Sequence, residues 1–128
     1  MPVLNEEKEF VAYVVELMQS VGSVHAKRMF GGHGIFLEGH MFGLVAGDVL
    51  YLKADEETRD DFNARGLEAF TYNKKGKEFK LSYFQAPEET LDDSDEMNVW
   101  ANKAYSTAVR AAAKKGKERK GKERKGKG

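Results

Sequence analysis

The sequence of 128 residues contains no cysteine. Disulfide bonds, zinc–thiolate sites and thiol catalysis are therefore excluded, and the composition suits a reducing cytoplasm. No apolar run approaches the ~18–20 residues that are needed to cross a bilayer. Residues 1–9 are acidic and lack the apolar stretch of a signal peptide. Together these absences predict a soluble cytoplasmic protein.

The formal net charge of zero hides two segments of opposite charge. Residues 114–128 hold nine Lys or Arg and two Glu, which gives +7. The 12 basic and 19 acidic residues of positions 1–113 give −7. The second segment has no apolar residue and repeats Gly-Lys-Glu-Arg-Lys, so it cannot offset its ordering entropy by burial. We predict one domain over residues 1–113 and a disordered basic tail over residues 114–128.

Three segments show the 3.6-residue period of an amphipathic helix. The first is expected to begin at an Asn5 cap and to end at Gly22. The second is expected over residues 56–65, with Asp55 as its cap. The third is expected to begin near residues 93–95.

Between the predicted helices, short runs of β-branched and aromatic residues alternate with glycine-containing turns, which is typical of antiparallel strands. Three strands are expected over residues 29–53, with hairpin turns at Gly39 and Gly47. The glycines of residues 31–34 are expected to bend the first strand without ending it. Two further strands are expected over residues 70–84. The order predicts a two-layer α+β fold: helix, three strands, helix, two strands, helix, with the helices packed on one five-stranded antiparallel sheet. The expected core residues are Phe10, Val14, Leu17, Leu50, Leu52, Leu81, Trp100 and Tyr105.

The histidines and glycines do not predict a chemical site. His25, His33 and His40 lack the His-x-x-x-His and His-x-His spacings of metal ligands, so positions in turns and at strand edges explain them better. The glycine run at residues 31–34 lies between strand-like segments and does not precede a helix, unlike a phosphate-binding loop. Because no nucleophile–base or paired-carboxylate pattern is found, we predict no catalytic residue, no metal and no cofactor.

One stretch resembles a known family. Arg28-Met29-Phe30-Gly31-Gly32-His33-Gly34-Ile35-Phe36 is similar to the R-x-M-F-G-G-x-G-[ILV] signature of the TfoX N-terminal domain, although Arg28 here directly precedes Met29. Weaker matches run on to Trp100-Ala101-Asn102-Lys103-Ala104, so the resemblance covers roughly residues 5–114. It implies a secretion-chaperone-like α+β domain. The signature residues, which we expect to be structural, are Arg28, Met29, Phe30, Gly31, Gly32 and Gly34.

The resemblance also implies a function. The TfoX/Sxy family is named for a regulator of natural competence that acts with the cyclic-AMP receptor protein at certain promoters. By this resemblance we expect a non-enzymatic regulatory or adaptor domain that modulates transcription through a protein partner. The cyclic-AMP receptor protein and RNA polymerase are the partners that it suggests. Longer members carry a second, helical domain after this one, and we expect the basic tail to take its place here.

The basic tail supports an alternative function, nonspecific association with nucleic acid by counterion release. A solubilising role and electrostatic attraction to the acidic domain are the competing explanations. The expected nucleic-acid contacts are Lys114, Lys115, Lys117, Arg119, Lys120, Lys122, Arg124, Lys125 and Lys127.

Overall fold

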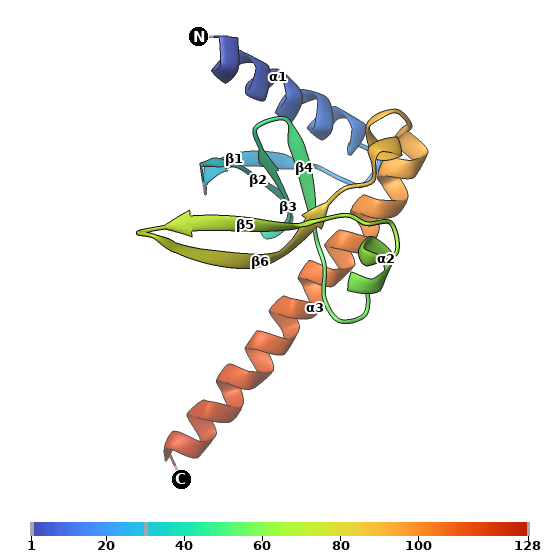
Figure 1. Cartoon of the computed structure of the whole chain (residues 1–128). Coiled ribbons are helices and arrows are strands. Elements are labelled where there is room, and N and C mark those ends of the chain that lie inside the picture. Colours follow the sequence, from blue (N-terminus) through green and yellow to red (C-terminus); the bar gives the residue numbers. More distant parts are fainter. Residues whose placement is uncertain (1, 30, 128) are drawn as a thin grey trace.

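The computed structural model describes the backbone of residues 2–29 and 31–127, and the side chains of residues 7–29, 31–79 and 81–115. Helices cover one face of a curled sheet, and the last helix projects beyond it (Figure 1). The elements in chain order are α1 (Pro2–Leu17), β1 (His25–Met29), β2 (Gly32–Leu37), β3 (His40–Ala46), β4 (Val49–Lys53), α2 (Arg59–Asn63), β5 (Ala69–Lys74), β6 (Lys77–Gln85), the 3-10 helix η1 (Glu88–Leu91) and α3 (Ser94–Lys127).

The sheet has six antiparallel strands in the order β1-β2-β3-β4-β6-β5. The α+β class is confirmed, whereas the prediction of five strands is wrong. The glycine-rich stretch forms a turn, because Met29 pairs with Gly32 across two intervening residues. Gly31 occupies this turn with a φ of +75°, a conformation that suits glycine. The first predicted strand therefore corresponds to β2 and the turn before it, and β1, most of which precedes residue 29, is missing from the prediction.

The helix boundaries also differ from the predictions. The first helix ends at Leu17, before Gly22, and Asn5 lies inside it. The second helix is much shorter than residues 56–65. Its predicted first turn is replaced by a side-chain-stabilised turn, in which Oδ1 of Asp55 accepts the backbone N–H groups of Glu57 and Thr58 at 3.0 and 3.2 Å.

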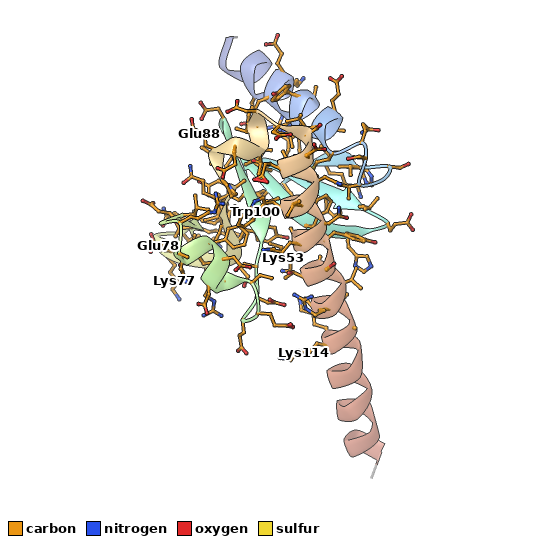
Figure 2. The ribbon with its side chains drawn as sticks, turned by 90° about the vertical axis from the view of Figure 1, so that its right-hand side faces the viewer. Lys53, Lys77, Glu78, Glu88, Trp100 and Lys114 are labelled. Atoms are coloured by element: carbon orange, nitrogen blue, oxygen red, sulfur yellow. The ribbon has the colours of Figure 1, made fainter. Side chains whose placement is uncertain are left out.

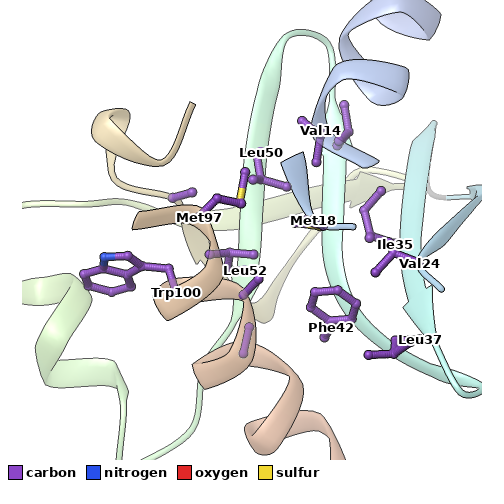
Figure 3. Packing of buried hydrophobic residues seen from close by; sticks show 14 of the residues in the cluster. Val14, Met18, Val24, Ile35, Leu37, Phe42, Leu50, Leu52, Met97 and Trp100 are labelled. Carbon is purple, nitrogen blue, oxygen red and sulfur yellow. The ribbon is translucent and has the colours of Figure 1, made fainter. Parts of the chain in front are cut away.

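The main core lies between the helices and one face of the sheet (Figure 3). Val14, Leu50, Leu52 and Trp100 are buried in it. Phe10, Leu17 and Tyr105 are only partly buried and pack at its border. Ile35 and Phe42 are large buried side chains that our core prediction omits.

A second, smaller cluster lies on the opposite face of the sheet, which we call the open face. Leu81 belongs here and not in the main core as predicted, because successive side chains of β6 alternate between the two faces. It packs with Leu44 of β3, Phe70 of β5 and Tyr83 of β6. The hydroxyl of Tyr83 donates to the carbonyl of Met41 at 3.2 Å, and burial raises its pKa to about 12. These contacts join the β5–β6 hairpin to β3 across the open face.

The backbone helix of α3 continues to Lys127 and carries the basic residues away from the sheet (Figure 1). Without apolar residues after Ala113, this part of the helix depends on local backbone hydrogen bonds. We still predict that residues 114–128 are disordered in the free protein and that the domain ends at residue 113.

Candidate functional site

The predicted signature residues build one corner of the sheet. Arg28 and Met29 end β1, Gly31 lies in the turn, and Gly32 and Gly34 lie on β2; Phe30 is outside the described residues. A Cβ atom at Gly32 would stand 2.0 Å from the carbonyl oxygen of Val45 on β3. Only a residue without a side chain allows β2 and β3 to approach this closely.

Gly34 makes room for three half-buried side chains on the open face. A Cβ atom at this position would lie 2.6 Å from Sδ of Met29, 3.0 Å from Cε1 of Phe36 and 3.1 Å from Sδ of Met41. These three residues, which we call the methionine patch, come from β1, β2 and β3. Thioether side chains are flexible and polarisable, so they adapt to apolar surfaces of different shape. The patch is therefore suited to binding another protein.

Two groups from β1 lie against the aromatic ring of the methionine patch. The ring of His25 stacks on Phe36, with centroids 5.7 Å apart and an interplanar angle of 14°. Nζ of Lys27 lies 5.3 Å from the centroid of the same ring. Both His25 and Lys27 are exposed, so the apolar patch has a rim that can be positively charged.

The three histidines have separate environments. His25 belongs to the rim just described, and His40 makes a T-shaped contact with the ring of Tyr105. Nδ1 of His33 lies 2.8 Å from Oε2 of Glu7, whose Oε1 accepts the backbone N–H of Gly47. The pair therefore joins α1 to β2 and to the β3–β4 turn. Within the described residues, no group of three His, Asp or Glu side chains is arranged to hold a metal ion.

A cavity of about 610 Å³ lies where the end of β4, the following loop and α3 meet. Arg110 donates to Oδ2 of Asp55 from Nε and Nη2 at 3.1 and 3.0 Å, and its Nε lies 3.1 Å from Glu57. Burial raises the pKa of Asp55, but the bonds from Arg110 and from two backbone N–H groups outweigh it and lower the pKa. These paired charges attach α3 to the loop, so we assign them a structural role.

Lys53 lines the same cavity without a carboxylate partner in the part of the chain that the structure describes. Its Nζ lies 5.0 Å from the ring centroid of Tyr83. Burial and repulsion from Lys115 lower the pKa of Lys53, against a weaker opposing effect of Asp55. Sequence patterns could not identify this residue, because its neighbours come from distant positions in β6 and α3.

The predicted nucleic-acid contacts lie on the projecting part of α3. Lys114 and Lys115 are exposed there, and the side chains from Lys117 onward are outside the described set. No described helix has the length and apolar character that would allow it to cross a membrane.

The comparisons with known proteins agree with the signature. The family model of the TfoX N-terminal domain matches residues 16–108. The chain is 34% identical to the DNA transformation protein TfoX1 of Aliivibrio fischeri over 82 residues, which are 64% of this chain and 37% of that protein. It is also 34% identical to the DNA transformation protein TfoX of Haemophilus influenzae over 85 residues, 65% of this chain and 39% of that protein. The chain therefore spans less than two-fifths of the length of either relative.

Proposed function

We propose that this chain, which belongs to the TfoX N-terminal domain family, is a non-enzymatic regulatory domain that acts by binding a protein partner. The names of the two relatives support a role in DNA transformation. The observation that carries the proposal is the methionine patch, because the signature residues Met29 and Gly34 help to form a half-buried apolar surface.

The rim of the methionine patch indicates what kind of partner would fit. The exposed ammonium group of Lys27 favours acidic groups around an apolar centre on the partner. We propose a component of transcription as the partner, either a regulator such as the cyclic-AMP receptor protein or RNA polymerase itself.

Substitution of Met29 and Met41 by serine tests this function. We expect the double variant to lose at least about tenfold in affinity, since burial of two methionine side chains contributes more than 1.4 kcal/mol. The measurement is binding to purified cyclic-AMP receptor protein and to purified RNA polymerase. Tyr13→Ser with Val99→Ser is the matched control, because both residues are exposed on the helical side. If neither protein binds the wild-type chain, or if the patch variant binds as well as wild type, the proposal is wrong.

The charge of residues 114–128 favours a second function, nonspecific contact with nucleic acid. Replacing all nine Lys and Arg residues of this segment by Gln should abolish most binding to random duplex DNA at low salt. In the wild type, the slope of log affinity against log salt should approach about −8 if all nine cations contact phosphates. Equal binding by both proteins, or binding that does not depend on salt, would exclude this function.

A further inference from the structure

The β5–β6 hairpin is a basic element within an acidic domain. Residues 69–85 hold four Lys and one Glu, which gives +3, whereas the rest of positions 1–113 holds eight basic and 18 acidic residues, or −10. Lys74, Lys75 and Lys77 at the tip are exposed. None of them has a carboxylate within 4.0 Å among the side chains that the structure describes. The tip therefore presents positive charge that the described side chains do not neutralise.

Aromatic side chains follow these lysines along the open face. Lys74 pairs with Lys77, and the next pair on the same face is Tyr72 with Phe79. Phe79 is 47% exposed, although burial of a phenylalanine is strongly favourable. Closer to the centre of the sheet, Tyr83 of the same strand is buried. From the tip to the base of the hairpin, the open face therefore carries first exposed lysines, then an exposed aromatic ring and then a buried aromatic ring.

Lys53 supplies a cation at the base of this hairpin. Its Nζ lies over the ring of Tyr83, and it faces the cavity that Lys114 also lines. Figure 2 shows Lys77 on the hairpin, Lys53 between the hairpin and α3, and Lys114 on α3. The seven residues from Lys77 to Tyr83 are separated by six steps of about 3.4 Å, so their ends lie about 20 Å apart. At the 3.4 Å per nucleotide of a stacked strand, that length corresponds to about six nucleotides.

We propose that the open face of the β5–β6 hairpin binds single-stranded nucleic acid. Lysine ammonium groups at both ends would hold phosphates, and the exposed ring of Phe79 would stack on an unpaired base, as on other aromatic platforms. A duplex offers no free base face to this ring, so we expect a preference for single strands. This surface shares no residue with the methionine patch but adjoins it at Tyr83, whose hydroxyl donates to the carbonyl of Met41. The proposal holds whether or not residues 114–128 bind nucleic acid.

The first test uses Phe79→Leu in the full chain. We expect about tenfold weaker binding to a single-stranded oligonucleotide of about twelve nucleotides, the size of one lost base–aromatic stack, and unchanged binding to the matching duplex. Fluorescence anisotropy with labelled DNA measures both. Tyr13→Leu is the matched control, because Tyr13 is 45% exposed but lies on α1. Phe79→Leu should weaken single-strand binding also in the variant whose nine basic residues in positions 114–128 are replaced by Gln. That result would show that binding by the hairpin does not depend on the basic tail.

The second test replaces Lys74, Lys75 and Lys77 by Gln. Three lost phosphate contacts should reduce the salt slope of single-strand binding by about 2, while Lys8→Gln on α1 leaves it unchanged. The proposal is overturned if either hairpin variant binds single strands like wild type, or if Phe79→Leu weakens binding to single strands and duplex equally.

Discussion

Trp100→Ala should lower the free energy of unfolding by about 3–5 kcal/mol, the range for loss of a large buried aromatic side chain. Trp100 is 6% exposed, and its ring makes a T-shaped contact with the ring of Phe62 at a centroid distance of 5.2 Å. Nζ of Lys103 lies 4.6 Å from its ring centroid. Removal of the indole therefore leaves a cavity between α3 and α2 and removes the aromatic surface that covers Phe62.

Chemical denaturation of the purified variant measures this effect. Val99→Ala is the control on the same helix, because Val99 is 56% exposed and should change the free energy of unfolding by less than about 0.5 kcal/mol. Similar unfolding midpoints for wild type and Trp100→Ala would mean that α3 does not pack on the sheet through this residue.

The core shows where sequence periodicity succeeds. Val14 and Trp100 lie on apolar helical stripes that have one buried side, so their burial follows from spacing. Strand alternation is less informative here, because both faces of the curled sheet bury apolar groups. Leu44 of β3 and Leu52 of β4 are each fully buried, but they lie in different clusters. The alternation of residues around Leu81 therefore predicts that its side chain packs against apolar groups, but not on which face of the sheet it does so.

The candidate sites depend on contacts that sequence patterns do not contain. Met41 joins the methionine patch because β2 pairs with β3, and nothing in the local sequence links it to Met29. Lys53 meets Tyr83 only because β4 pairs with β6. The lysines around Gly76 are visible in the sequence as a turn. Their position beside an exposed Phe79 becomes visible only when the strand register is known.

Gly32→Ala should destabilise the protein by at least about 3 kcal/mol, the upper part of the range for an extra methyl group in a closely packed site. The new Cβ would lie 2.0 Å from the carbonyl oxygen of Val45 and 3.2 Å from Cα of Ala46. Both are backbone atoms, so no rotation of a side chain can relieve the overlap. β2 and β3 must separate, and the pairing of His33 with Val45 is weakened as a result.

Gly31→Ala is the matched control for Gly32→Ala, since the two glycines are neighbours in the same hairpin. A Cβ atom at Gly31 would meet nothing within 4 Å. An alanine held at the φ of +75° that Gly31 adopts should nevertheless lower the free energy of unfolding by about 1 kcal/mol through backbone strain. Thermal and denaturant unfolding of both variants should therefore rank Gly32→Ala as much the more destabilised. Equal losses would mean that the glycines are needed only for the turn, and that the close approach of β2 to the carbonyl of Val45 contributes nothing.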